Sequence, residues 1–187
     1  MQIEGGTGNG YKAKVTDENM LLTKAVTVSD EHHVNKTEGE AYSWYFTTDP
    51  DAADDCVFYL KNDSDKDLII EGMDLFVTDD CDVYVKLGGS GTYATATTAV
   101  VGANLNAGSG NVADVTCGKH TDIEGAGSTF SGGTEVARYV YQEGTLKDTH
   151  HINFPCDLII PKNQIFTLWV DTIAIVIQCT VWGYFHD

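Results

Sequence analysis

The C-terminal stretch of residues 154–185 places the strongest constraint on the fold. It contains three apolar runs, at 158–160, 165–170 and 173–184, which are separated by short polar breaks and are rich in β-branched and aromatic residues. Apolar runs of this length and composition between turn residues are typical of β-strands. We therefore predict consecutive antiparallel strands at this end of the chain.

The last of these runs alternates along its length. Successive side chains of a strand point to opposite faces, so every second residue belongs to the same face. One face is almost wholly aliphatic and consists of Ile173, Ile175, Ile177, Cys179, Val181 and Gly183. The other face is mixed and includes Gln178 and Trp182. This pattern predicts a strand in the middle of a β-sandwich, with its pairing partners drawn from earlier in the chain.

The rest of the chain repeats such runs and shows no convincing helical period. Strand-like runs lie at 41–46, 56–61, 67–78, 81–87, 92–101, 112–117 and 135–142. A polar turn is predicted at 32–35, and a glycine-rich loop region at 102–134. Many short strands with long crossing connections favour a jelly roll over a simple meander. The predicted class is all-β, an antiparallel β-sandwich of jelly-roll type.

A single domain preceded by an arm is the expected organisation. At 187 residues the chain is long enough for one well-buried core and short for two. Residues 1–20 are rich in glycine and have no period, which predicts a flexible or extended N-terminal arm. The jelly-roll domain is then expected to cover residues 21–187.

The charge balance is strongly acidic. The chain has 28 Asp and Glu against 11 Lys and Arg, which gives a formal net charge of −17. A field of this sign repels nucleic acid and anionic membrane surfaces. We therefore expect neither nucleic acid nor a membrane as a partner.

Five cysteines, Cys56, Cys81, Cys117, Cys156 and Cys179, show no CxxC pair and no regular spacing. Several fall in strand-like runs, where a free Cys behaves as a small hydrophobic residue. We predict reduced, buried thiols.

The sequence shows no charged and apolar leader and no run of about 18 apolar residues that could cross a bilayer. Folding in a reducing cytoplasm is consistent with these features.

Asp63, Asp65 and Asp67 have the alternating spacing of the carboxylates in a calcium loop. The EF-hand pattern, however, requires Gly at the position of Leu68 and flanking helices. A solvated turn is the better interpretation, which leaves the three aspartates as weak metal candidates and predicts no resident cofactor. A second acidic run, with the same interpretation, consists of Asp49, Asp51, Asp54 and Asp55.

Two adjacent histidine pairs, His32-His33 and His150-His151, are poorly arranged for a shared metal. Within a strand, the two rings of a pair point to opposite faces. One His from each pair could form a cupin-like metal site, but the cupin spacing of G-x5-H-x-H is missing. There is also no Gly-x-Ser-x-Gly elbow. We predict that the protein is not an enzyme.

Three aromatic residues, Trp44, Tyr45 and Trp182, could stack on sugars, as in jelly-roll lectins. Each of them lies in an apolar strand-like run, so packing inside the sandwich is the favoured interpretation.

A family resemblance extends over most of the chain. The segments that carry it are the glycine-rich arm, Ala13-Lys14-Val15, Leu21-Leu22, YLKNDSDKDLIIEG, VGANLNAGSGNVADVT, IIPKNQIFTLWV and the final WGYF. In style and architecture the chain resembles the small jelly-roll structural proteins of tailed bacteriophages. These proteins decorate, or cement, the outside of the phage head.

The resemblance implies a virion protein that binds the phage major capsid protein and stabilises the shell by bridging its subunits. Proteins of this kind form homo-oligomers, often trimers, and are made in the cytoplasm of the bacterial host. Their location is the capsid surface. The arm would become ordered on the particle by strand addition or by burial between subunits.

The expected contact residues lie in the arm and in the run 92–101. Small side chains in this run predict close approach by another chain or element. The interface candidates are Gly5, Gly8, Tyr11, Lys12, Lys14, Thr95 and Thr97.

An alternative function is a head-fibre or tail-associated adhesion module that binds a host surface glycan with the loops of 102–134. Loops held at one end of a rigid sandwich suit recognition. Glycan binding would require exposed aromatic residues in these loops, and Phe130 is the one aromatic residue there. This composition favours assembly over adhesion.

Overall fold

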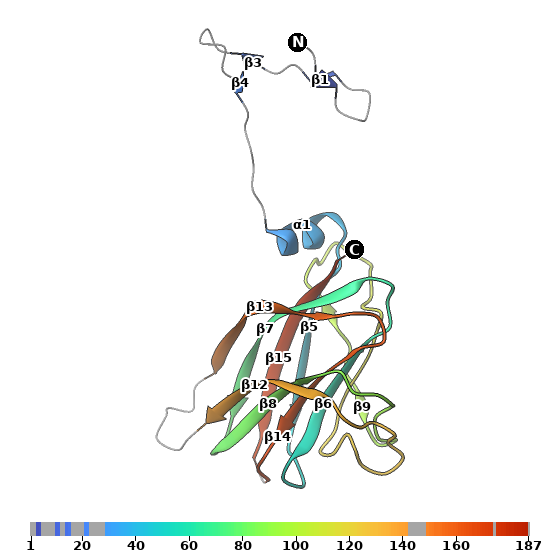
Figure 1. Cartoon of the computed structure of the whole chain (residues 1–187), viewed down its shortest axis with the longest axis vertical. Helices are drawn as coiled ribbons and strands as arrows, with labels where there is room; N and C mark the ends of the chain where they lie inside the picture. The colour runs from blue at the N-terminus through green and yellow to red at the C-terminus, as the bar shows by residue number, and fades with distance from the viewer. Residues whose placement is uncertain are drawn as a thin grey trace.

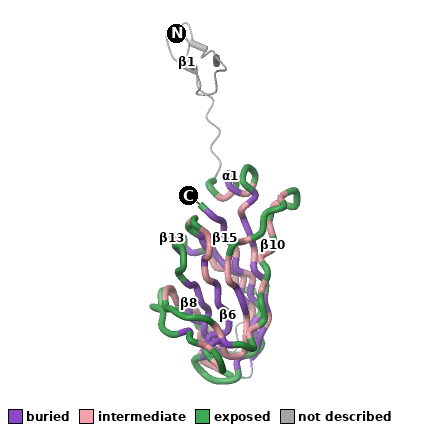
Figure 2. The backbone as a smooth tube through the Cα atoms, turned by 90° about the vertical axis from the view of Figure 1, so that its right-hand side faces the viewer, coloured by how far each residue is buried: buried purple, intermediate pink, exposed green. Residues whose placement is uncertain are grey.

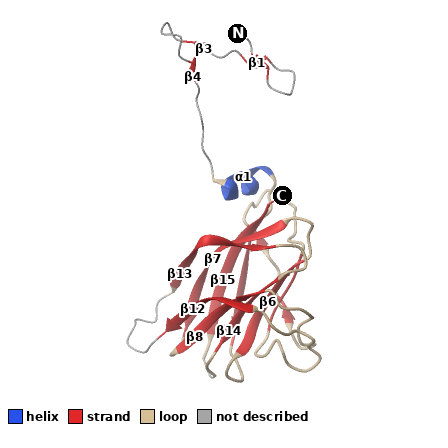
Figure 3. Ribbon diagram, viewed as in Figure 1, coloured by secondary structure: helices blue, strands red, loops and turns tan. Residues whose placement is uncertain are grey.

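The structure is a computed structural model that describes residues 29–141, 149–173 and 175–186, together with four two-residue strands near the N-terminus. The predicted sandwich of two antiparallel sheets is confirmed (Figure 1). Strands form the body of the domain, and one short helix lies at one end of it (Figure 3).

The first sheet has five strands in the order β10-β5-β15-β7-β13. These strands are β5 (Ala41–Thr48), β7 (Asp67–Val77), β10 (Ala103–Asn104), β13 (His150–Ile160) and β15 (Ile177–His186). The second sheet has six strands in the order β12-β8-β14-β6-β11-β9. They are β6 (Asp55–Asn62), β8 (Cys81–Leu87), β9 (Thr98–Ala99), β11 (Val115–Lys119), β12 (Thr134–Tyr141) and β14 (Ile165–Val170).

Four N-terminal strands join neither sheet. β1 (Ile3–Glu4) pairs with β2 (Gly10–Tyr11), and β3 (Lys14–Val15) pairs with β4 (Leu21–Leu22). The remainder of the predicted arm lies outside the described residues.

β15 occupies the centre of the first sheet, as predicted. It pairs with β5 on one side and with β7 on the other, and both partners come from earlier in the chain. The predicted alternation is confirmed within β15, because Ile177, Cys179 and Val181 all face the core. The strand begins at Ile177, whereas Ile173, expected on the same face, lies before it and is 51% exposed. The three C-terminal runs do not pair with one another. β14 belongs to the second sheet, and β7 lies between β13 and β15 in the first.

The core lies between the two sheets, where buried positions follow the strands (Figure 2). Aromatic rings link the two layers. Phe46 of β5 stacks on Phe58 of β6 with ring centroids 4.5 Å apart. Phe58 in turn meets the edge of Phe166 of β14 at 6.2 Å. Ring pairs of this geometry stabilise a core beyond the area that they bury.

The predicted polar turn at 32–35 is wrong, because these residues belong to helix α1 (Asp30–Thr37). The Ser29 side chain caps the helix by accepting a hydrogen bond from the backbone N–H of His32 at 3.2 Å. Gly39, with a φ of 66°, follows its C-terminal end. The cap and the glycine were visible in the sequence, but eight residues are too few to show a helical period.

The predicted strand at 92–101 is also wrong, apart from the two residues of β9. This segment and the loop 120–133 instead fold over the outer face of the second sheet. The apolar cluster formed there consists of Cys56, Tyr59, Tyr84, Ile123, Phe130, Ile165 and Trp169, with Tyr93 packed against it. Tyr84 on the outer face of β8 belongs to this cluster, so that side of the strand is covered.

Replacing Phe46 with Ala should lower the free energy of unfolding by about 3 to 5 kcal/mol, since it removes the ring that joins the sheets and leaves a cavity. Urea denaturation followed by circular dichroism measures this change. The matched control is Tyr45→Ala on the exposed side of the same strand, expected to change stability by no more than about 0.5 kcal/mol. Equal effects of the two substitutions would contradict the assignment of the core.

Candidate functional site

The weak metal candidates do not face a common point. The Asp63 carboxylate accepts a hydrogen bond from Lys61 Nζ at 2.7 Å, and Asp65 forms an ion pair with Lys162. Asp67 is exposed at the start of β7. Burial raises the pKa of Asp63, but hydrogen bonds from Lys61 and a threonine outweigh burial and hold this pKa below its usual value. The first two aspartates therefore have lysine partners at this turn.

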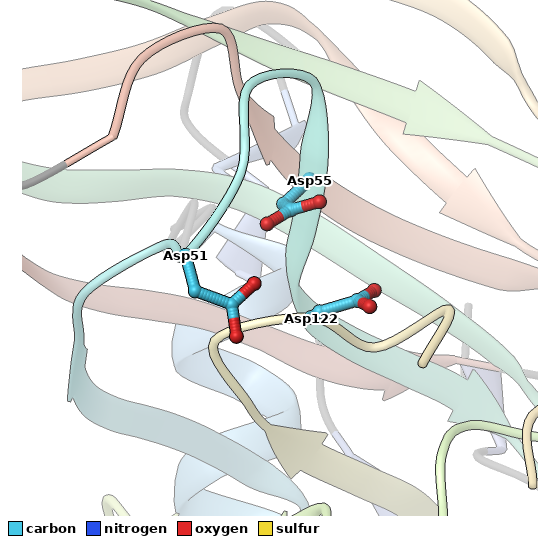
Figure 4. Close-up of side chains that lie close together, drawn as sticks. All are labelled: Asp51, Asp55 and Asp122. Atoms are coloured by element: carbon cyan, nitrogen blue, oxygen red, sulfur yellow. The ribbon is translucent and has the colours of Figure 1, made fainter. Parts of the chain in front are cut away.

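A different set of carboxylates comes together at one end of the second sheet (Figure 4). Asp51 lies before β6, Asp55 begins β6, and Asp122 lies in the loop after β11. Each of the three places one oxygen within 4.8 Å of the other two. Asp55 is only 9% exposed, and its Oδ2 accepts a hydrogen bond from the backbone N–H of Ala52 at 2.7 Å.

Burial and like charges both disfavour the ionised form of Asp55 in this acidic cluster. Burial is the largest cause that raises the pKa of Asp55, the hydrogen bond from the Ala52 N–H lowers it, and the neighbouring Asp122 and Asp51 raise it further. Thr121 Oγ1 donates to Asp51 at 3.0 Å, and the backbone N–H of Glu124 donates to Asp122 at 2.8 Å. A hard cation such as Ca²⁺ takes about six to eight oxygen ligands. Three carboxylates supply only part of such a set.

The sequence marked two members of the cluster and missed the third. Asp51 and Asp55 fall in the second acidic run, whereas Asp122 lies far along the chain. It reaches the others because β11 pairs with β6. Local spacing carries no signal for that pairing.

Asp122→Asn should raise the melting temperature by about 2 °C at pH 8, since it removes one of three clustered like charges and keeps an acceptor for Glu124 N–H. Chelator should leave the melting temperature of the unaltered protein unchanged. Differential scanning calorimetry measures both effects. A large drop with chelator, together with a lower melting temperature for the variant, would instead identify a cation site.

The two histidine pairs do not meet. The first pair lies on α1. In the second pair, the His150 ring lies edge-on to Tyr141 at 4.8 Å. His151 stacks on Trp182 at 5.1 Å, with its Nδ1 2.8 Å from the Asp74 carboxylate. Among the described residues, the acidic cluster is the one group of three metal-ligating side chains found so close together.

The asparagine-rich part of the region 102–134 holds α1 in place. The side chains of Asn104 and Asn111 donate to the backbone carbonyls of Gly39 and Glu38 at 2.7 and 2.8 Å. Carbonyls at a helix C-terminus lack partners within the helix. These two amides, which belong to the loops considered above for glycan recognition, thus have partners inside the domain.

Acidic side chains also meet where α1 lies on the first sheet. Val34 of α1 packs against the outer face of this sheet in an apolar cluster that includes Tyr184. Beside it, burial and the charges of Glu31 and Asp157 raise the pKa of Glu71 to about 7. Apolar contact therefore holds the helix in place, while charge repulsion opposes that contact at neutral pH.

Glu71→Gln should stabilise the protein at pH 8 and have little effect at pH 4. The folded protein binds a proton at Glu71 that the unfolded chain releases near pH 4.5, so stability falls as pH rises from 4.5 to about 7. Glu71 is partly exposed, so solvent screens its charge. The substitution should therefore raise the free energy of unfolding at pH 8 by about 1 kcal/mol. Urea denaturation across this pH range measures it. Asp80→Asn in an exposed turn is the control, and the same pH dependence in both variants would contradict the assignment.

Surface aromatic residues lie on the outer face of the first sheet. Trp44 is fully buried, as predicted, but its neighbour Tyr45 is 59% exposed. Trp182 is half-buried beside His151. The prediction that all three candidate aromatic residues pack inside the sandwich is therefore wrong for Tyr45 and holds only in part for Trp182, which is half-buried and packs against the main core cluster.

The interface candidates from the arm cannot be placed by their side chains. Gly5, Gly8 and Lys12 lie outside the described residues. Tyr11 belongs to β2 and Lys14 to β3, with side chains that are not described.

Thr95 and Thr97 make close contacts within the chain. A Cβ at Gly127 would lie 2.2 Å from Thr95 Oγ1, and a Cβ at Gly118 would lie 2.5 Å from Thr97 Cγ2. The close approach predicted for 92–101 is thus made by elements of the same chain, β11 and the loop that follows it.

All five cysteines are free, and four of them are buried. The prediction of burial is wrong for Cys156, which is exposed on β13. Burial raises the pKa of the Cys56 and Cys117 thiols well above its ordinary value, which disfavours the reactive thiolate. No helix in the described part of the chain has the length and apolar character needed to cross a membrane.

Comparisons of the chain with protein-family models, curated proteins and solved structures gave no match.

Proposed function

We propose that this protein is a non-enzymatic virion structural protein that binds the outside of a phage capsid and stabilises the shell by bridging subunits of the major capsid protein. It is made in the cytoplasm of the bacterial host and acts as a homo-oligomer on the capsid surface. The order of the strands carries the proposal.

Eight longer strands, β5 to β8 and β12 to β15, have the orders β5-β15-β7-β13 and β12-β8-β14-β6 in the two sheets. Consecutive strands alternate between the sheets, except for β8 and β12, which are neighbours. This alternation supports a jelly roll, which is built from two Greek keys and is used by viral capsid domains, lectins and cupins. These three classes of protein differ in the functional sites that they carry.

A cupin-like enzyme would need histidines that converge on a metal. His150 contacts Tyr141, whereas His151 pairs with Asp74 on the outer face of the first sheet. Cys56 and Cys117 are also poor nucleophiles, because burial raises the pKa of their thiols and so disfavours the reactive thiolate. These arrangements support a structural role over a catalytic one.

The N-terminal segment supports attachment to a larger partner. β1 to β4 pair with one another and join neither sheet. A segment of this kind can add to the edge of a partner's sheet or become buried between subunits. Many such contacts on one shell would act together through avidity. The net charge of −17 suits an outward surface or a basic capsid partner.

One observation favours the alternative, an adhesion module for a host surface glycan. Tyr45 and Trp182 both border solvent on the outer face of the first sheet, and aromatic rings of this kind can stack on sugars. Phe130, the one aromatic residue of the proposed recognition loops, is buried. Binding of the protein to host cells, lost in Tyr45→Ala, would make adhesion the leading function.

Deleting residues 2–19 should leave a folded protein that no longer co-sediments with capsids, because the deletion removes the proposed attachment arm and spares both sheets. Sedimentation of capsids mixed with the full-length or the truncated chain measures attachment. An unchanged melting temperature serves as the control for folding. Full binding by the truncated chain would refute the role of the arm.

A further inference from the structure

The two sheets end in four edge strands, and three of these are protected against further pairing. β9 and β10 are two residues long. β13 is longer, but its pairing with β7 is interrupted between Asn153 and Leu158, a segment that contains Pro155. Short length, proline and bulges are common devices that stop an edge strand from adding a partner.

The fourth edge strand, β12, is long and carries few such devices. It has eight residues, and among the described residues it pairs with β8 alone. Its one irregularity lies between Glu135 and Ala137, and the pairing is continuous from there to Tyr141. The strand contains no Lys and no Pro. Val136 and Val140 are 46% and 59% exposed.

The inner side of β12 leaves the core partly open. Ala137, Tyr139 and Tyr141 pack against the main core cluster but are only partly buried. A strand added beside β12 would cover their exposed flank. It would also satisfy the row of backbone N–H and C=O groups that an edge strand presents.

The charge of β12 sets it apart from the rest of the chain. Glu135 and Arg138, its two charged residues, form an ion pair at 3.0 Å, so the strand is neutral in a chain with a net charge of −17. Arg138 also contacts Asp82 at 3.2 Å and lies over the Tyr84 ring. Two copies of such an acidic protein repel each other least where their meeting surfaces carry no net charge.

We propose that β12 pairs with β12 of a second copy in an antiparallel, two-fold symmetric contact that joins the two six-stranded sheets. Directly opposed residues of antiparallel strands point to the same face. The partly buried tyrosines of both copies then lie on the core side, and the exposed Val140 of both copies lies on the outer side. A symmetric contact of this kind closes on itself as a dimer and covers the long edge that the described strands leave without a partner at β12.

Sedimentation velocity over a wide protein concentration range tests this contact. The unaltered protein should be dimeric. The double variant Val136→Lys/Val140→Lys should raise the dissociation constant at least about tenfold, since it places like charges opposite each other. The matched control is Val101→Lys/Val112→Lys, with the same change at positions 78% and 76% exposed elsewhere, and it should remain dimeric. Each variant lowers the net negative charge, so a loss of dimer cannot be attributed to overall repulsion.

Hydrogen exchange of the unaltered protein provides a test that needs no variant. Backbone amides of β12 should exchange more slowly at high than at low protein concentration, and those of the edge strand β13 should not change. The proposal would be overturned if the unaltered protein were a monomer at every concentration or a trimer. It would also be overturned if the dimer survived the β12 substitutions, or if the control variant lost the dimer to the same extent. The contact does not depend on capsid binding, so failure of either proposal leaves the other standing.

Discussion

The pairing of β15 with both β5 and β7 is the constraint on which the rest of the structure depends. β15, which follows all the other strands of this sheet in the sequence, fills its centre, so the sheet cannot close before β15 is in place. Pairings between distant segments are typical of slowly folding β proteins. Once the sheet is closed, the stack of Phe46 on Phe58 joins it to the second sheet. The positions of the other strands, and with them the outer faces and the edges of the two sheets, follow from this central arrangement.

The two outer faces are covered in different ways, and what is left uncovered defines the surfaces for partners. α1 and its asparagine caps cover one end of the first sheet. The insertion between β8 and β12 covers the second sheet with an aromatic cluster. In the described part of the chain the neutral edge of β12 has no strand beside it, and Tyr45 borders solvent on the first sheet. These are the surfaces that the proposed contacts use.

Apolar runs and alternation were sufficient to predict most of the longer strands, because their side chains face either the core or the opposite side of the sheet. They missed the first part of β13, which begins at His150 and not at Leu158, because most of the residues between these two positions are not buried. They were also insufficient for α1, since an eight-residue helix makes only about two turns. The Thr- and Ala-rich segment 92–101 suits a strand by composition, yet its small side chains serve close contacts with glycines of the same chain. The acidic cluster could not be predicted because Asp122 joins Asp51 and Asp55 through strand pairing, which leaves no mark on local spacing.

Strands that alternate between the two sheets, an N-terminal segment that joins neither sheet and a strongly acidic composition all support the proposed capsid role. The most direct test is the copy number of the chain in purified particles of the phage proposed to encode it. Quantitative mass spectrometry, with the major capsid protein as the internal reference, gives this number. The proposed role predicts many copies, in proportion to the capsomers of the shell. Absence from the particles, or only a few copies as expected of a tail-tip module, would contradict it.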